Sequence, residues 1–299
     1  MSDRRFLIIF HSGRENAIAG ASKVLEQLFD AGVTPVVLPE DRSALAEDAP
    51  GLELFDPERP VELILTLGGD GTILRAAEWQ RATGAPMLGI NMGHVGFLAE
   101  AEMADLEEVV RRSVAGSYEV EERLTLAVSV FHGHRLVYET WAANEAAIEK
   151  SGSGRMIEVV IAVDNRPISS FGTDAVLMSS ASGSTAYSFS AGGPIVWPTL
   201  EAMLMVPLGA HALFTRPLVV APDSMMSVDV IADSTGPGVL WCDSRRSFPL
   251  PPGSRVEARK GIPLRFARLS EAPFADRLVA KFNLPVVGWR EQARIEQPK

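Results

Sequence analysis

Residues 64–75 read ILTLGGDGTILR, an apolar run that breaks into a glycine-rich turn and then resumes with helical character. A glycine turn between a strand and a helix often binds phosphate, because free backbone N–H groups and the helix dipole point at the anion. This turn carries a carboxylate, Asp70, in its middle, where it would repel phosphate. The glycines on both sides of Asp70 allow a ligand to approach the carboxylate closely. The alternative is an ordinary Asp-Gly turn in which Thr72 caps the helix.

The first hundred residues alternate strand and helix patterns around this stretch. Continuous apolar runs predict buried strands at 5–10, 33–38, 61–67 and 86–91. Helical spacing predicts helices at about 17–29, from about 72, and at about 103–115. This alternation predicts an α/β domain with a parallel sheet and helices on both faces. In such sheets ligands bind beyond the carboxyl ends of the strands, where GGDGT (68–72) and NMGHVGF (91–97) both lie.

From about Tyr118 the pattern changes to short strands and turns, with Asp164-Asn165 as a tight turn. This half predicts an all-β, antiparallel domain of two sheets over 119–269. The last thirty residues return to a helical pattern, which we expect to pack on the first domain. The expected organisation is therefore one domain from 1–118 plus 270–299, and a second from 119–269.

Composition excludes several classes of protein. The chain has 299 residues, enough for two domains, and a net charge of −10 that makes a nucleic-acid backbone an unfavourable partner. The single cysteine, Cys242, rules out an intrachain disulfide framework and is typical of a reducing compartment. No apolar run approaches the roughly 20 residues of a membrane-spanning helix. These observations predict a soluble, cytoplasmic protein without a nucleic-acid or membrane partner.

Three common catalytic signatures are absent from the sequence: the P-loop, the G-x-G-x-x-G dinucleotide fingerprint and the G-x-S-x-G nucleophile elbow. Two other stretches are candidates for ligand binding. The segment SASGSTAYSFSAGGPI (180–195) supplies hydroxyls and free N–H groups, although an ordinary loop has a similar composition. Asn144-Glu145 lies among small apolar residues, where two polar side chains are costly to bury unless they pair or hold a ligand.

Taken together, these motifs resemble the NAD kinase family. The resemblance rests on GGDGT (68–72), NMGHVGFLAE (91–100), NE (144–145), TD (173–174), SGSTAYSFSAGGPI (182–195), HALFTRPLVV (211–220) and CDS (242–244). GGDGT alone is shared with lipid kinases and, more distantly, with phosphofructokinases. The ordered set is specific, and the family fold has the same two parts.

The resemblance implies phosphoryl transfer from ATP to the 2′-hydroxyl of the adenosine ribose of NAD, which gives NADP. Asp70 would accept the hydroxyl proton, and a divalent ion, most often Mg²⁺, would accompany the donor. The NAD-binding residues that it implies are Gly71, Arg75, Phe97, Asn144, Glu145, Arg155, Asp174, Thr185, Ala186, Tyr187, Ser188 and Ser190. No residue is assigned as a metal ligand. A homo-oligomer, a dimer or tetramer, is also implied.

The sequence departs from the family pattern in four places. Ala175 replaces a glycine, Ala181 a proline and Arg245 a common glutamine, while Gly172 resembles members that also use inorganic polyphosphate. Two other functions stay open at this stage. One is a lipid or sugar kinase that shares only GGDGT, and the other is a non-catalytic NAD(P)-binding sensor.

Overall fold

The computed structural model describes residues 4–47, 49, 51–93, 96–99, 101–102, 105–152, 155–234, 236–269 and 274–286. The chain forms two units, Met1–Glu121 with Arg265–Lys299, and Glu122–Leu264. None of the helices in the described ranges combines the length and apolarity that a membrane crossing requires.

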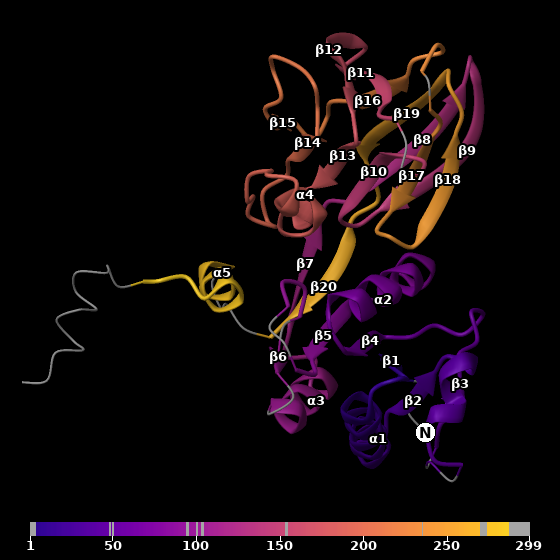
Figure 1. Ribbon diagram of the computed structural model, residues 1–299. Helices are drawn as coiled ribbons and strands as arrows, with labels where there is room; N and C mark the ends of the chain where they lie inside the picture. Colours follow the sequence, from indigo (N-terminus) through magenta and orange to yellow (C-terminus); the bar gives the residue numbers. More distant parts are fainter. Residues whose placement is uncertain are drawn as a thin grey trace, which may run out of the picture. The chain divides into compact units, whose positions relative to one another are not determined.

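An eight-stranded sheet forms the centre of the first unit, with the order β3-β2-β1-β4-β5-β20-β7 and with β6 paired to β5 (Figure 1). The pairings among β1 to β6, and that between β5 and β20, are parallel. The strands are β1 (Arg5–Phe10), β2 (Thr34–Val37), β3 (Glu53–Leu54), β4 (Leu63–Leu67), β5 (Met87–Asn91), β6 (Ala101–Glu102), β7 (Glu119–Arg123) and β20 (Leu264–Arg268). The predicted α/β domain with a parallel sheet is thus confirmed.

Helices cover both faces of this sheet. Phe6, Ile8 and Phe10 of β1 share a core with α1 (Glu15–Asp30) and α3 (Leu106–Val114), whereas α2 (Asp70–Thr83) lies on the other side (Figure 1). Because side chains alternate along a strand, Leu7 and Ile9 point to this second face, where they are also buried. A strand covered on both faces explains the continuous apolar run of the sequence.

Helix α2 begins two residues earlier than the sequence predicts. Gly69 is its N-cap, in an extended conformation, and Asp70 rather than Thr72 is its first residue. A carboxylate in the first turn is favourable because the helix N-terminus carries a partial positive charge. The acid therefore belongs to the helix, and the turn before it consists of glycine alone.

The C-terminal helix α5 (Phe274–Phe282) contacts the loop that follows β5. The rings of Phe274 and Phe282 lie 5.9 and 5.7 Å from the ring of Phe97, centroid to centroid. The Arg277 guanidinium donates a hydrogen bond of 2.9 Å to the carbonyl oxygen of Ala99. The last described helix thus fixes residues 97–99.

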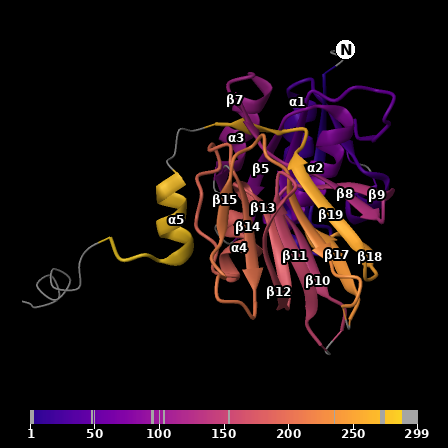
Figure 2. The ribbon, with the colours of Figure 1, turned by 90° about the horizontal axis from the view of Figure 1, so that it is seen from above.

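The second unit consists of two six-stranded antiparallel sheets, of order β15-β14-β13-β10-β17-β18 and β12-β11-β16-β19-β8-β9. The strands are β8 (Leu126–His132), β9 (Arg135–Ala142), β10 (Glu145–Lys150), β11 (Ile157–Val163), β12 (Arg166–Thr173), β13 (Ala175–Ser180), β14 (Met203–Leu208), β15 (Leu218–Val220), β16 (Met226–Val230), β17 (Gly238–Cys242), β18 (Arg246–Leu250) and β19 (Ser254–Lys260). Buried side chains of both sheets form one core, and the succession β15-β14-β13 can be followed in Figure 2. The predicted two-sheet β domain is confirmed.

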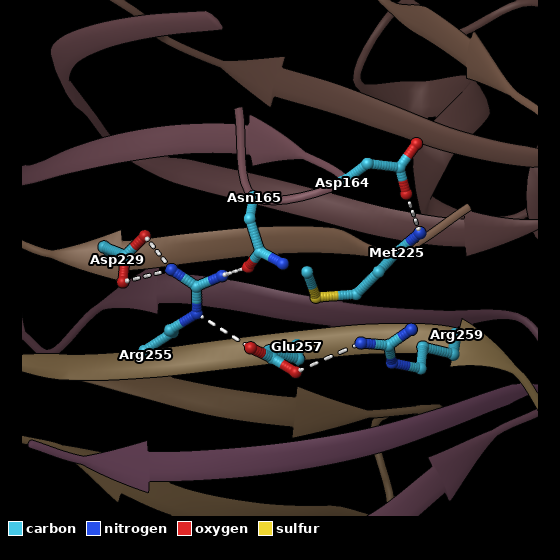
Figure 3. A network of polar contacts seen from close by, with 7 residues as sticks. All are labelled: Asp164, Asn165, Met225, Asp229, Arg255, Glu257 and Arg259. Atoms are coloured by element: carbon cyan, nitrogen blue, oxygen red, sulfur yellow. Dashed lines mark hydrogen bonds and ion pairs between the residues drawn. The ribbon is translucent and has the colours of Figure 1, made fainter. Parts of the chain in front are cut away.

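The turn between β11 and β12 is the predicted one. Asp164 and Asn165 adopt left-handed conformations, with φ of 51° and 59°. The Asp164 carboxylate also accepts a hydrogen bond of 2.8 Å from the backbone N–H of Met225 (Figure 3). The turn is therefore joined to the start of β16.

Arg255 on β19 connects this turn to the neighbouring strand β16. It donates to Asn165 over 2.8 Å and to Glu257 over 2.9 Å, and it pairs with Asp229 of β16 over 3.2 Å (Figure 3). Such partly exposed pairs each contribute about 0–1 kcal/mol. The network joins neighbouring strands but adds little to the stability of the unit.

Candidate functional site

The carboxylate of Asp70 is held by the loop after β5. Its Oδ2 accepts the backbone N–H of Phe97 over 3.2 Å and its Oδ1 accepts that of Leu98 over 3.1 Å. A carboxylate has about four acceptor sites, so roughly two remain for a ligand. Asp70 is half-buried, and both of its carboxylate oxygens are oriented by backbone N–H groups.

The glycines around Asp70 divide into two kinds. A Cβ atom added to Gly96 would lie 2.5 Å from Oδ1 of Asp70, and one added to Gly68 would lie 2.3 Å from the Thr72 hydroxyl. These two positions are fixed by packing. A Cβ atom added to Gly69 or Gly71 would meet nothing within 4 Å. Packing within the protein therefore does not require glycine at positions 69 and 71. Open space beside these glycines is what we expect of a site that a ligand occupies.

Arg75, one turn further along α2, already has carboxylate partners. It forms an ion pair with Asp41, whose side chain is only 2% exposed, and a longer one of 3.5 Å with Glu40. It also donates to the carbonyl oxygen of Phe10. Its expected role at a phosphate stays a prediction.

Phe97, expected to pack on an adenine, is 6% exposed and contacts the two phenylalanine rings of α5. The sequence indicated that the C-terminal segment packs on the first domain, but not that it covers Phe97. The role of Phe97 in binding adenine also stays a prediction.

A pocket of about 270 Å³ opens in the second unit. Its lining combines three acidic or phenolic groups with an indole and a hydroxyl, from Glu145, Ala147, Glu149, Tyr187, Trp241 and Ser244. Three of these residues alternate along β10, so they lie on one face of the strand. The structure thus brings together two of the predicted residues, Glu145 and Tyr187.

Asn144 and Glu145 are buried, with 8% and 6% of their surface exposed. Asn144 ends the bend before β10 and Glu145 is the first residue of that strand. Within the described chain, Oδ1 of Asn144 and Oε2 of Glu145 have no hydrogen-bond partner. Unsatisfied buried oxygens are costly, which favours a ligand over the alternative of a self-paired couple.

The pKa of Glu145 is raised to about 8. Burial is the main cause, and the charge of the nearby Asp243 carboxylate is the second. Burial, followed by the charge of Asp243, also raises the pKa of the Cys242 thiol to about 12. Both groups are therefore neutral at pH 7. The pocket holds a carboxylic acid that can donate a hydrogen bond.

The remaining predicted residues differ in their surroundings. Asp174 forms an ion pair of 2.7 Å with Lys150. Ser188 is buried, whereas Ser190 and Arg155 are exposed. Thr185 and Ala186 are partly exposed and lie beside Tyr187, at the junction of the short helices η3 (Ser182–Thr185) and α4 (Tyr187–Ser190).

Sequence reasoning missed four residues of this region, Glu149, Trp241, Asp243 and Ser244. The alternation of side chains along a strand could have indicated Glu149. In a strand that starts at Glu145, residues 145, 147 and 149 point to the same face. CDS (242–244) was part of the recognised pattern, but nothing in the sequence showed its contacts with residues 143–145.

Two family models match the chain. The model of the ATP-NAD kinase N-terminal domain matches residues 6–118, and that of the ATP-NAD kinase C-terminal domain matches residues 143–264. The NAD kinase of Leifsonia xyli subsp. xyli is 54% identical to the chain over 296 residues, which cover 97% of each protein.

Solved structures share the fold. The yeast NADH kinase complexed with NADH superposes with a TM-score of 0.85 at 20% identity, covering 95% of this chain and 89% of that one. An NAD kinase from Archaeoglobus fulgidus in complex with ATP gives a TM-score of 0.71 at 24% identity, covering 93% and 98%. On the two domain matches and the full-length similarity, the chain belongs to the NAD kinase family.

Proposed function

We propose that this protein transfers a phosphoryl group from ATP to the 2′-hydroxyl of the adenosine ribose of NAD, forming NADP. The observation that carries the proposal is Asp70, an acid at the head of α2 with free acceptor capacity and open space above Gly69 and Gly71. A secondary alcohol needs its proton removed as the bond to phosphorus forms. Asp70 would take that proton over a hydrogen bond of about 2.6–3.2 Å.

The other chemistry of phosphoryl transfer is positioning and charge neutralisation. Asn144, Glu145 and Tyr187 are proposed to bind NAD, supported by the pocket and by the two buried oxygens without partners among the described residues. The first unit would then be the kinase unit and the second the NAD-binding unit. The complexes of the relatives with NADH and with ATP support both substrates.

We assign the divalent ion, Mg²⁺, to the donor rather than to a cage of side chains. No cluster of three or more His, Cys, Asp or Glu is placed to hold a metal among the residues that the structure describes. Mg²⁺ usually keeps several waters and binds through one or two carboxylates plus substrate phosphates, so the donor set present is compatible with it. When bound, the ion would supply charge neutralisation on the transferring phosphate.

A homo-oligomer is the proposed state of assembly. It is supported by large apolar side chains exposed on the second unit, at Trp197, Leu200, Leu213 and Phe214. Contiguous exposed apolar surface is typical of interaction sites, so these side chains are candidates for the contact between copies. The single, buried thiol of Cys242 supports the proposed cytosolic location.

The test is NADP formation by the purified protein from NAD, ATP and Mg²⁺, with polyphosphate and NADH in parallel reactions. We expect NADP with ATP, and NADP with polyphosphate if Gly172 marks a broader donor range. NAD binding without turnover on any donor would instead favour a sensor. Phosphorylation of a lipid or sugar without NADP would favour the wider kinase superfamily, which the match to the C-terminal domain disfavours.

A further inference from the structure

The turn between β17 and β18 has left-handed backbone at two successive residues, as in a hairpin turn of type I′. Asp243 and Ser244 have φ of 52° and 53°, although neither is glycine. Asp tolerates this conformation better than Ser, for which surrounding contacts must help to hold it. Asp243 is also 95% buried, so its side chain supplies contacts that can hold the turn.

The Asp243 carboxylate fixes the chain that leads into β10. Its Oδ2 accepts the N–H of Ala143 over 2.8 Å, and its Oδ1 accepts those of Asn144 and Glu145 over 2.7 and 3.3 Å. In return, the N–H of Asp243 donates to the carbonyl oxygen of Glu145 over 3.0 Å. Three successive backbone donors thus converge on one carboxylate that lies about a hundred residues further along the chain.

Arg246 completes this arrangement. It donates to Oδ2 of Asp243 over 3.0 Å and to the carbonyl oxygen of Trp141 over 2.9 Å, and it lies over the Trp141 ring at 4.4 Å. From the opposite side, the N–H of Ser180 donates to the carbonyl oxygen of Asn144 over 2.8 Å. The backbone that carries Asn144 and Glu145 is therefore held on both sides.

The groups that face Glu145 are mostly acidic or neutral. They come from its own strand, from β17, from the β17–β18 turn and from α4, and they are Glu149, Cys242, Asp243 and Tyr187. The cation next to this cluster, Arg246, is paired with Asp243. Burial raises the pKa of Tyr187, which keeps the phenol neutral. Burial and the Asp243 charge both raise the pKa of Glu145, and a hydrogen bond from the backbone of Tyr187 opposes them. Burial also raises the pKa of Asp243 itself, while the three backbone N–H groups and Arg246 favour its ionised form.

We propose that Asp243 is a positioning residue that orients Asn144 and Glu145, so that the Glu145 carboxyl donates a hydrogen bond to an acceptor oxygen of the bound dinucleotide. Burial, and after it the charge of Asp243, favours the protonated form of Glu145 that this requires. The inference rests on the proposed NAD binding. A pyridine dinucleotide offers ribose oxygens and an anionic pyrophosphate, and an ionised glutamate would repel the latter. A neutral acid binds such oxygens without repulsion.

The experiment is calorimetric titration of the full chain with NAD, without donor, from pH 6 to pH 9. Wild type should lose affinity above about pH 8, by up to tenfold per pH unit. Glu145→Gln keeps a neutral donor, so it should bind within about threefold of wild type at pH 7 and lose this alkaline decline. Glu139→Gln, the same change at an exposed site on β9, should keep the decline.

Asp243→Asn separates electrostatic coupling from packing. Without the charge of Asp243 the Glu145 proton is held less tightly, so the decline should begin at lower pH and affinity should recover toward wild type at pH 6. A merely structural role would lower affinity equally at every pH. The proposal is overturned by a flat wild-type profile, by loss of binding in Glu145→Gln at pH 7, or by an unshifted profile in Asp243→Asn.

Failure of the proposed function is distinguishable from failure of this inference. Proton-linked NAD binding without NADP formation would contradict the kinase reaction alone. NADP formation with a flat binding profile would contradict the inference alone. Absence of NAD binding at every pH would overturn both.

Discussion

The backbone N–H of Leu98 donates a hydrogen bond to Oδ1 of Asp70 over 3.1 Å, so the proposed catalytic base is oriented by the loop after β5. Arg277 of α5 in turn donates to the carbonyl oxygen of Ala99 in the same loop. The orientation of Asp70 therefore depends on two other segments of the first unit, the loop after β5 and helix α5. Substitutions in such a segment test the orientation without changing the acid itself.

Gly71→Ala should fold normally and lose activity. A Cβ atom there meets nothing within 4 Å, and alanine favours the helix, so the free energy of unfolding should stay the same or rise by up to about 1 kcal/mol. The methyl group would occupy space that we assign to the ribose, so kcat/KM for NAD should fall. Urea unfolding and steady-state kinetics measure the two effects, and unchanged kinetics would contradict the assignment of that space.

Gly96→Ala is the matched comparison, because its methyl group would lie 2.5 Å from Oδ1 of Asp70. Here both the free energy of unfolding and the activity should fall. Overpacking should cost about 1–3 kcal/mol of stability, and kcat should be lower. A variant with normal stability and normal kcat would show that the Asp70 carboxylate is not held where the structure has it.

Arg75→Ala should destabilise the first unit strongly. It leaves the buried Asp41 carboxylate without its partner, which typically costs about 3–5 kcal/mol. The double variant Asp41→Asn with Arg75→Ala should recover part of that loss, because no buried charge then remains. Chemical denaturation measures both. Arg111→Ala, which removes an exposed pair on α3, serves as the control with little effect.

Stability should decrease as the pH rises through the range where Glu145 ionises. The pKa of Glu145 is about 8 in the folded protein against 4.5 for an unperturbed glutamate, so the folded state binds more protons between these values. Its contribution is fully present below pH 4.5, falls by up to about 1.4 kcal/mol per pH unit, and is lost above about pH 8. The difference in unfolding free energy between wild type and Glu145→Gln, measured from pH 5 to pH 9, should show this slope. A pH-independent difference would mean that Glu145 ionises normally.

The sequence predicted the strands β1, β2, β4 and β5 of the first unit, because strands such as β1 and β4 are buried on both faces and leave continuous apolar runs. It did not predict β3 and β6, which have two residues each, or place β7 and β20 in this sheet. It also predicted the Asp164-Asn165 turn, since those residue types tolerate the left-handed conformation. These are local properties of the chain, which a single sequence records directly.

Long-range contacts could not be predicted in the same way. The pairing of Arg75 with Asp41 joins residues 34 positions apart, and the bonds from residues 143–145 to Asp243 span about a hundred. Charged residues at such separations carry no periodic signal. The sequence therefore identified Glu145 as a candidate but did not reveal the burial, or the neighbouring acid Asp243, that raise its pKa.

The most direct test of the central claim is turnover by Asp70→Asn, measured as NADP formed from NAD, ATP and Mg²⁺. The substitution keeps the shape of the side chain and removes the base, so we expect kcat to fall by about 10²–10⁴-fold while calorimetry still detects NAD binding. Near-normal turnover by Asp70→Asn beside an active wild type would contradict the role of Asp70 as the base.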